Sequence, residues 1–574
     1  MIEKIVYLPV LLMVLLLTAC AGAPAVRSES PPQLQTAIEE ALPSVELEQD
    51  ILYDVLLGEI AGKRGRIGVS VDVLARAARK TRDPRLAERA ARAALYIKDY
   101  EAALAIAELW VELQPEDIEA RSALATTLLG LNRPVEAQLH FEKVLAIAAA
   151  QDKLEHTFLR IASILGQQGN RGTAFELMES LVRLYPNEPH AHFALAHLAV
   201  RADDPVQARA AIDQALALRP DWEDAALFKV RILISRKDNA AAEAFFQDFV
   251  RRNPDATRVR LNYARFLVDL KQWEKARKQF KRVVKAAPND ADAVMAVGLL
   301  ALQVNRLDEA ETYLKRNLEL QPGNDQARLY LGQVAEQRRQ YDEAERWYRE
   351  ISDENYYFEA QMRVAVIIAM RGDVPAARKR LHGIRTRTER ERVQAVLTEE
   401  QILREVKQYG EAFDVLTRAL ASMPAQHDLL YARALVAEKL DKLDVVERDL
   451  RAVLKRDPKN VNALNALGYT LADRTDRYDE ALALLTEALE QKPNDPFVLD
   501  SMGWLQYRLG NYDEAIRYLE QALALRDDAE ISAHLGEVLW MAGDRTQART
   551  VWRRALKHTP DNESLLSIIK KFGQ

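Results

Sequence analysis

The chain has 574 residues, of which 48% are hydrophobic and 29% are charged, and its net charge is -6. So weak a negative charge argues against a nucleic-acid partner or an acidic membrane surface, because both normally require an excess of basic residues. The one cysteine of the chain, Cys20, can form neither an internal disulfide nor a multi-thiolate metal site. Alanine, leucine, glutamate and arginine dominate the sequence, which favours helix almost throughout.

The first residues have the features of a cleaved export signal. Lys4 precedes an apolar run from Ile5 to Leu17, which is interrupted by Pro9. A helix of this length rises only about 20 Å, less than the roughly 30 Å of a bilayer's hydrocarbon core, so it suits a signal peptide better than a membrane span. The run ends in Leu-Thr-Ala-Cys at residues 17–20, which resembles the lipobox of bacterial lipoproteins. The alternative is an ordinary secretory signal that happens to contain a cysteine.

The lipobox resemblance implies that residues 1–19 are removed and that Cys20 becomes the acylated first residue of the mature protein. Several acyl chains form a stable anchor without any spanning helix. No aspartate follows the cysteine, and among lipoproteins this implies transfer to the outer membrane, with the body of the protein facing the periplasm. Residues 20–44 contain four prolines and are predicted to form a flexible tether between the lipid and that body.

Prolines recur along the rest of the chain at a constant interval. Five of them follow one another in steps of 34 residues, and a later pair keeps the spacing and the phase: Pro186, Pro220, Pro254, Pro288 and Pro322, then Pro424 and Pro458. A repeat of this length is typical of a solenoid of helical pairs, in which each unit packs only on its neighbours. Since proline cannot continue a helix, it is expected to follow the second helix of each unit.

Small residues also recur at fixed places in each unit. In the unit that begins near residue 496, these and their larger neighbours are Leu499, Met502 and Gly503 in the first helix and Ala515, Leu519 and Ala522 in the second. A small residue at a helix crossing lets two backbones approach, and large residues fill the groove beside it. The pattern resembles the tetratricopeptide repeat (TPR). The resemblance implies an all-α TPR solenoid, a right-handed superhelix of about 14–15 helical pairs over residues 45–560, with a long concave face.

Two segments depart from the regular pattern. Residues 352–392 lack the periodic prolines and carry a charged run at 385–392, which predicts a bend in the solenoid. A solvated helix start is an equally good interpretation of that run. Residues 561–574 are predicted to contain a single capping helix, from Glu563 to Phe572, that covers the last repeat.

No signature of catalysis is present. The sequence lacks the metalloprotease, phosphate-binding and serine-hydrolase motifs. His190 and His197 are seven residues apart on one expected helix and so share a face, but the sequence offers no further ligand for a metal. We therefore interpret them as ordinary groove or core histidines, and we expect a protein without catalytic residues, metal or cofactor.

The concave groove of this repeat type is lined chiefly by positions two, five, nine and twelve of each first helix. Near the C-terminus these positions hold Asn465, Tyr469, Phe497, Asp500, Trp504, Tyr507, Glu537 and Trp540. An aromatic-rich strip that faces a groove has the composition expected of a binding hot spot. The alternative is that these rings pack between helices and are already buried.

The chain also resembles one particular group of long proteobacterial repeat lipoproteins. The resemblance rests on the lipobox, the proline-rich tether, a first unit reading Ile-Leu-Tyr-Asp-Val-Leu-Leu-Gly-Glu-Ile-Ala at residues 51–61, and the regular repeats at the C-terminus. In that group, members are adaptors that bind and activate periplasmic carboxyl-terminal processing proteases and bring them substrates such as peptidoglycan hydrolases. An alternative function is that of a scaffold in an envelope machine for polysaccharide export or pilus assembly.

Overall fold

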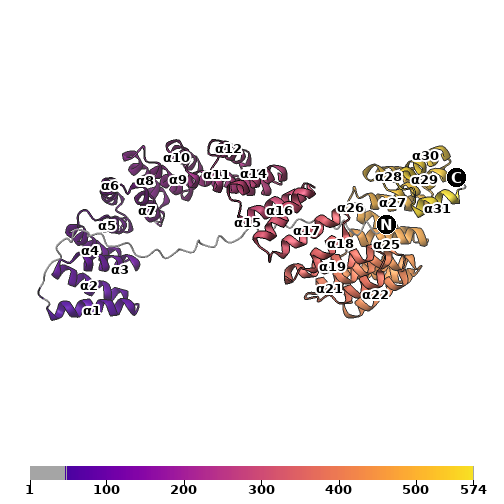
Figure 1. Cartoon of the computed structure of the whole chain (residues 1–574), viewed down its shortest axis with the longest axis horizontal. Coiled ribbons are helices and arrows are strands. Elements are labelled where there is room, and N and C mark those ends of the chain that lie inside the picture. The colour runs from indigo at the N-terminus through magenta and orange to yellow at the C-terminus, as the bar shows by residue number, and fades with distance from the viewer. Residues whose placement is uncertain (1–45, 47, 168, 573–574) are drawn as a thin grey trace. The chain divides into compact units, whose positions relative to one another are not determined.

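The computed structural model describes residues 46, 48–167 and 169–572, and all the regular structure in these residues is helical. Thirty-one α-helices follow one another along the chain (Figure 1). This confirms the predicted all-α TPR solenoid. Among these helices, none is long and apolar enough to cross a membrane. The predicted signal peptide 1–19, Cys20 and the tether 20–44 lie outside the described residues.

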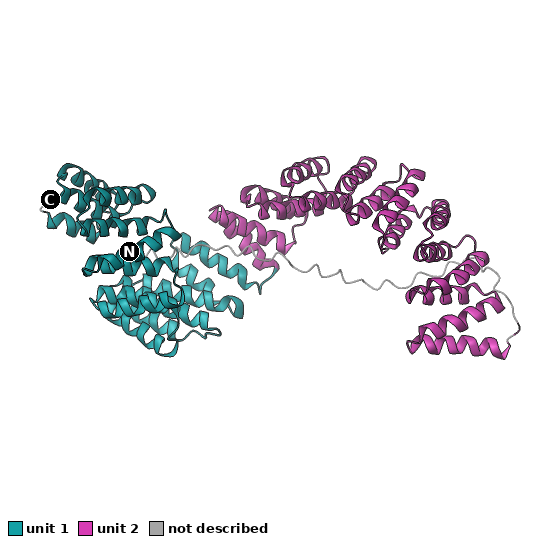
Figure 2. Ribbon diagram, turned by 180° about the vertical axis from the view of Figure 1, so that it is seen from behind, with its two compact units in different colours: residues 1–18, 321–574 teal, residues 19–320 magenta. Residues whose placement is uncertain are grey.

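The chain divides into two compact units, with the boundary between Leu320 and Gln321 (Figure 2). We call the described residues before the boundary the N-terminal unit. Its helices are α1 (Gln49–Lys63), α2 (Ile67–Thr81), α3 (Pro84–Tyr96), α4 (Tyr100–Leu113), α5 (Ile118–Gly130), α6 (Pro134–Ala150), α7 (Leu154–Gly166), α8 (Arg171–Leu184), α9 (Pro189–Arg201), α10 (Pro205–Leu218), α11 (Glu223–Ser235), α12 (Asn239–Arg252), α13 (Thr257–Asp269), α14 (Trp273–Ala286), α15 (Ala291–Gln303) and α16 (Leu307–Leu320).

The described residues after the boundary form the C-terminal unit. Its helices are α17 (Asp325–Gln337), α18 (Tyr341–Arg349), α19 (Glu354–Met370), α20 (Val374–His382), α21 (Glu389–Glu405), α22 (Tyr409–Ser422), α23 (His427–Lys439), α24 (Leu443–Arg456), α25 (Val461–Arg474), α26 (Tyr478–Gln491), α27 (Pro496–Arg508), α28 (Tyr512–Leu525), α29 (Ala529–Ala542), α30 (Arg545–His558) and α31 (Glu563–Lys571). In both units an odd-numbered helix opens each pair and the next helix closes it.

Proline, asparagine and aspartate residues mark the ends of the helices. Every proline of the 34-residue series lies two residues after the second helix of a pair, as Pro254 does after α12 and Pro458 after α24. This confirms that proline separates one pair from the next. Asparagine or aspartate often precedes the first helix and caps it. The side chain of Asp495, for example, accepts hydrogen bonds from the backbone N–H groups of Phe497 and Val498.

Most turns inside a pair contain one residue in the left-handed region. In the N-terminal unit this residue recurs with the repeat, at Asp203, Lys237, Lys271 and Asn305, with φ between 56° and 60°. In the α27–α28 turn the same place is taken by Gly510, with φ of 83°. Glycine adopts this conformation without a steric penalty, whereas a lysine there carries some strain. The turn geometry is therefore set by the packing of the pair rather than by the residue in the turn.

Small residues bring the two helices of a pair close together. A Cβ atom added to Gly503 of α27 would lie 2.7 Å from Cγ of Leu519 in α28 and 3.1 Å from the carbonyl oxygen of Ala515. Equivalent close approaches link Gly298 to Leu314 and Gly468 to Leu485. The large partner in each case is fully buried. These glycines confirm the small-residue positions predicted from the repeat.

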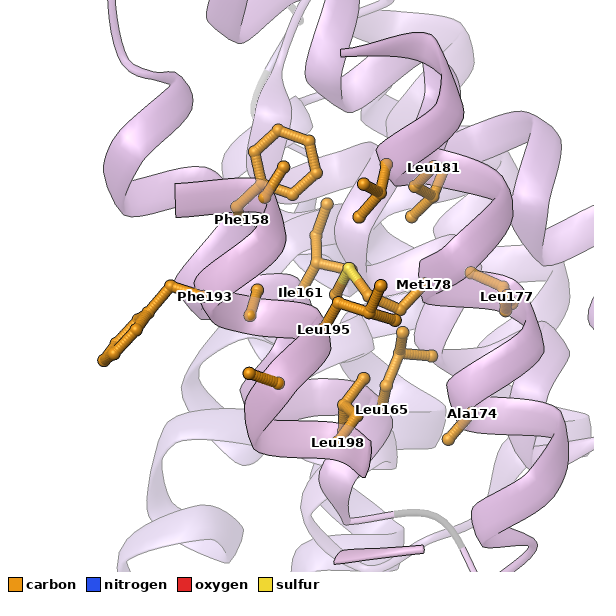
Figure 3. Close-up of a cluster of buried hydrophobic side chains, with 14 of the residues drawn as sticks. Phe158, Ile161, Leu165, Ala174, Leu177, Met178, Leu181, Phe193, Leu195 and Leu198 are labelled. Atoms are coloured by element: carbon orange, nitrogen blue, oxygen red, sulfur yellow. The ribbon is translucent and has the colours of Figure 1, made fainter. Parts of the chain in front are cut away.

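The hydrophobic core runs through successive pairs instead of forming one centre. Around α7, α8 and α9 it contains Phe158, Ile161 and Met178, all fully buried (Figure 3). Leu195 and Leu198 of α9 point into this cluster, whereas Phe193 of the same helix points away from it. A helix in the solenoid therefore presents one side to its neighbours and leaves another for the groove.

Helix lengths are irregular in the segment 352–392 and just before it. The second helices α18 and α20 have nine residues each, whereas the first helices α19 and α21 have seventeen. The charged run at 385–392 is the start of α21, where Thr388 and Glu391 form a capping box. The run is therefore a helix start, and the bend itself stays a prediction. At the end of the chain, α31 follows the last pair and buries Leu565.

The close approach at Gly503 gives a testable prediction. Gly503→Ala places a methyl group against Leu519, and such overpacking costs about 1–3 kcal/mol of unfolding free energy. The control is Gly410→Ala in α22, where an added Cβ meets nothing within 4 Å, so only the gain in helix propensity of about 1 kcal/mol remains. Urea unfolding followed by circular dichroism measures both. Equal effects of the two substitutions would contradict the packing argument.

Candidate partner-binding site

Three first helices near the C-terminus, with α31, surround a pocket of about 540 Å³. Four of the predicted groove residues line it. Its lining consists of Tyr469 and Asp473 from α25, Trp504, Tyr507 and Arg508 from α27, Glu530, Ala533, His534 and Glu537 from α29, and Ser564, Ser567, Ile568 and Lys571 from α31. The 34-residue repeat places these side chains together, because equivalent positions of successive first helices stack along one face.

Trp504 forms the fixed wall of this C-terminal pocket. Only 8% of the residue is exposed, and its indole N–H donates to Oδ1 of Asp473 over 3.0 Å. Its ring centroid lies 4.4 Å from that of His534 and 5.0 Å from that of Tyr507. A buried tryptophan with its N–H satisfied is held in one orientation, so it offers a partner a rigid edge rather than a mobile ring.

A buried ion pair lies behind the wall. Nδ1 of His534 is 2.9 Å and 3.1 Å from the two carboxylate oxygens of Asp500. Burial by itself lowers the pKa of His534, but the charge of Asp500 and of two nearby glutamates outweighs it, so the pKa of His534 lies above its ordinary value. The contact with Asp500 therefore favours the protonated imidazole more than in a free histidine, and the contact joins α29 to α27.

The terminal helix adds a second ion pair at the pocket. Nζ of Lys571 lies 2.8 Å from Oε1 of Glu537, a side chain that is almost completely buried. Burial, together with the charge of Glu537, raises the pKa of Tyr507 to about 12. Tyr507 therefore stays protonated across the physiological range. Because Lys571 comes from α31, the pocket is complete only when the terminal helix is in place.

The other four predicted residues lie elsewhere. Asp500 is buried in its pair with His534, and Asn465 is half-buried in α25 without lining the pocket. Phe497 is 45% exposed and lies under the guanidinium of Arg526. Trp540 packs on Trp552 and Phe572, with ring centroids 5.8 Å and 5.5 Å away. The predicted strip is therefore partly a pocket and partly interhelical packing, as the two interpretations of the sequence had allowed.

The histidines of α9 have separate environments. Nδ1 of His190 lies 2.7 Å from Glu188, and His192 contacts the carbonyl oxygen of Pro186 over 2.8 Å. The ring of His197 instead stacks on Phe228, with centroids 3.9 Å apart. Within the described residues, no group of three histidine, cysteine, aspartate or glutamate side chains is placed to hold a metal ion. What the arrangement offers is a surface for binding.

The N-terminal unit contains a larger pocket that the sequence analysis missed. Its volume is about 890 Å³, and its lining comes from α7, α9, α11, α12 and α13. Three of its residues, His197, Arg231 and Arg265, are successive members of the 34-residue series. The same rule that was applied to the C-terminal repeats identifies them. These three positions hold no tryptophan, tyrosine or phenylalanine, unlike the equivalent positions near the C-terminus.

Comparison with known proteins agrees with this fold. Tetratricopeptide-repeat patterns match residues 167–232, 233–300, 295–357, 461–528 and 501–563. A TPR repeat-containing protein of Pseudomonas aeruginosa is 40% identical over 511 residues, which cover 88% of this chain and 86% of that protein. The chain belongs to the tetratricopeptide-repeat family. TPR folds mediate the binding of protein partners, and this solenoid is a scaffold suited to protein–protein interaction.

More distant similarities concern the repeat alone. A human protein O-mannosyl-transferase is 25% identical over 171 residues, which are 29% of this chain but only 19% of that enzyme. Among solved structures, a thermophilic TPR protein of Thermus thermophilus is 25% identical and covers 30% of this chain and 95% of its own, with a TM-score of 0.29. A TPR protein of Parabacteroides merdae is 15% identical and covers 49% and 97%, with a TM-score of 0.34.

The Asp500–His534 pair predicts a pH dependence of stability. The pKa of His534 is higher in the folded chain than the value of about 6.5 for an unfolded histidine. The contribution of His534 to the free energy of unfolding is therefore fully present below about pH 6.5 and is lost as the pH rises through the folded pKa. Thermal melting at intervals between about pH 6 and about pH 9 should show this loss. The double variant Asp500→Asn/His534→Gln serves as the control, and a wild-type profile that parallels it would contradict the prediction.

Proposed function

We propose that this protein is a lipid-anchored adaptor at the periplasmic face of the outer membrane. It binds and activates a carboxyl-terminal processing protease and delivers substrates such as peptidoglycan hydrolases for degradation. The chain itself carries out no reaction. The observation that carries the proposal is the pocket of about 540 Å³ around Trp504, whose walls are fixed by ion pairs and which offers rings and charges to a partner.

The chemistry of the pocket suits protein recognition. Tyr469, Trp504 and Tyr507 supply aromatic contact area, and Asp473, Glu530 and Arg508 supply polar groups at its edge. Rigid aromatic side chains surrounded by polar groups dominate the energetics of protein interfaces. No nucleophile activated by a neighbouring base accompanies them in the described pocket, and this arrangement supports binding rather than catalysis.

An adaptor needs no catalytic residue to raise the rate of proteolysis. Holding a protease and its substrate on one scaffold converts their encounter into an intramolecular event, with an effective concentration as high as the millimolar range. Activation requires in addition that the scaffold bind the active conformation of the protease more tightly than the inactive one. The acyl chains expected on Cys20 would confine both steps to the membrane surface.

Ser567 offers a way to block the pocket without disturbing the core. It is exposed on α31 and lines the pocket, so Ser567→Trp places an indole in the opening while every buried contact remains. We expect the mature lipoprotein, captured from detergent-solubilised envelopes, to retain a processing protease and wall hydrolases, and the variant to lose the protease. Ser422→Trp, at an exposed position of α22, is the control and should behave as the wild type.

Mass spectrometry of the captured proteins decides between the proposed partner and its rival. Recovery of polysaccharide-export or pilus components without a protease would overturn the adaptor and favour a scaffold in an envelope machine. With purified protease, addition of the wild-type chain should accelerate substrate cleavage, and Ser567→Trp should abolish the acceleration. The purified chain alone should cleave nothing.

The lipid anchor expected at Cys20 gives a separate testable prediction. Cys20→Ser removes the thiol that the lipobox resemblance marks for acylation. Loss of several acyl chains, each contributing about 0.8 kcal/mol per buried CH₂, should move the protein from the outer-membrane fraction to the soluble periplasmic fraction. Fractionation followed by immunoblotting measures this. Unchanged sedimentation of Cys20→Ser with the membrane would refute lipid anchoring at this residue.

A further inference from the structure

The pocket of the N-terminal unit has an apolar wall. Phe193 is buried and points away from the other labelled side chains of its cluster (Figure 3), and its ring lies 4.6 Å from that of Trp222 and 5.6 Å from that of Phe228. His197 stacks on Phe228 with an interplanar angle of 8°. Burial, with the nearby charge of Arg231, lowers the pKa of His197 to about 4, so its ring is neutral at physiological pH.

Apolar side chains also continue from this wall to the rim of the pocket. Leu159 of α7 and Ile234 of α11 both line the pocket and are 36% and 41% exposed. Single exposed apolar residues are common at protein surfaces, but a contiguous patch with a concave aromatic floor marks a binding site. The volume of about 890 Å³ is large enough for several side chains of a partner.

Two arginines of the pocket have no acidic partner. Arg231 lies over the ring of Phe228, with its guanidinium carbon 4.8 Å from the centroid, and Arg265 stands at the equivalent position of the next repeat. Neither forms an ion pair with a carboxylate of the described chain. Nε of Arg265 is buried, and no described group accepts a hydrogen bond from it. A buried donor that has no acceptor within the chain is satisfied only by an acceptor from outside it.

The carboxylates that also line the pocket do not neutralise these arginines. Glu155 lies 3.2 Å from Nε2 of His190, and Asp224 forms an ion pair of 2.8 Å with Arg258. Asp269 is exposed at the end of α13. Asp224 is therefore engaged with another arginine, and within the described residues none of the three acids forms an ion pair with Arg231 or Arg265.

We propose that this pocket binds a polypeptide segment of a partner in which a bulky apolar side chain stands next to a carboxylate. The apolar side chain enters the space beside Phe193 and Phe228, and the carboxylate accepts hydrogen bonds from Arg231 and Arg265. Arginine suits this role because its planar guanidinium matches a carboxylate in a bidentate manner, whereas lysine acts as a point charge. This inference does not depend on the identity of the partner at the C-terminal pocket.

The repeat explains why the two arginines act on one segment. They occupy the same position in α11 and α13, which are successive first helices, so both side chains leave the same face of the solenoid. An extended or helical segment that runs along the groove would meet them in turn. His197 stands at the same position one repeat earlier, and its neutral ring extends the apolar end of the site. The site is thus polar at one end and aromatic at the other.

Peptide binding to the full mature chain tests the proposal. The probe is a short fluorescein-labelled peptide in which Phe and Leu alternate with Asp and Glu, with an amidated C-terminus. A second peptide carries Asn and Gln in place of the acids, and a third adds a free terminal carboxylate to the second. Fluorescence anisotropy should show the acidic peptide binding at least about tenfold more tightly than the neutral one. Binding of the third peptide alone would assign the carboxylate to a chain terminus.

Charge reversal locates the site. Arg231→Glu and Arg265→Glu should each weaken the acidic peptide about ten- to hundredfold, whereas Arg282→Glu, at an exposed arginine of α14 outside the pocket, should leave it unchanged. The double variant should instead prefer a peptide with Lys in place of Asp and Glu, a gain that misfolding cannot produce. The proposal fails if the acidic and neutral peptides bind alike, or if both arginine variants bind as the wild type does.

The same experiment separates this site from the C-terminal pocket and from self-association. Ser567→Trp should not change the affinity for the acidic peptide, so loss of the protease and loss of peptide binding are independent results. Sedimentation at several protein concentrations follows the oligomeric state. Self-association that is lost in Arg231→Glu would overturn the proposal, because the occupant of the pocket would then be a second copy of this chain.

Discussion

The close contact between the two helices of each pair is the constraint on which the rest of this structure depends. At Gly503 and Gly468 the backbone of one helix lies against a leucine of the next, with no room for a side chain between them. That short distance sets the angle at which the two helices of a pair cross, and this arrangement recurs with the sequence repeat. Once every pair has the same geometry, equivalent positions of successive first helices fall into rows. The rows supply most of the lining of both pockets, to which Trp222, just before α11, and the terminal helix α31 also contribute.

Because each helical pair packs only on its neighbours, the residues that face the groove can differ from pair to pair while the core of each pair stays apolar. The pocket around Trp504 is rich in rings and in ion pairs, and its charged groups are largely satisfied within the chain. The pocket around Phe228 has a deeper apolar wall and two arginines that lack an acidic partner. One repeat geometry thus supports two surfaces of different chemistry.

Two ion pairs of the C-terminal unit hold the groove in shape and also affect the stability of the fold. Asp500 with His534 joins α27 to α29 behind the pocket wall, and the largely exposed Lys571 joins α31 to the buried Glu537. Taking such charges out of water is costly, and their attraction offsets the cost only when the geometry is good. Here these ion pairs help to hold the ring of Trp504 and the helix α31 in a single arrangement. A partner then meets a preformed surface and loses little entropy on binding.

The sequence by itself determined the all-α fold, the repeat length and the ends of the pairs, because proline, glycine and alanine act through local backbone geometry that needs no distant contact. It also placed Tyr469, Trp504, Tyr507 and Glu537 on one face. The tertiary structure decided which of the rings remain accessible. Asp500 and Trp540 belong to the same pattern, yet Asp500 is buried in its pair with His534, and Trp540 packs on Trp552 and Phe572 instead of lining the pocket. Burial depends on the volume of side chains from other repeats, and no spacing rule contains that information. Nor could spacing reveal that Arg231 and Arg265 lack a partner, because an ion pair depends on the distance between side chains in space.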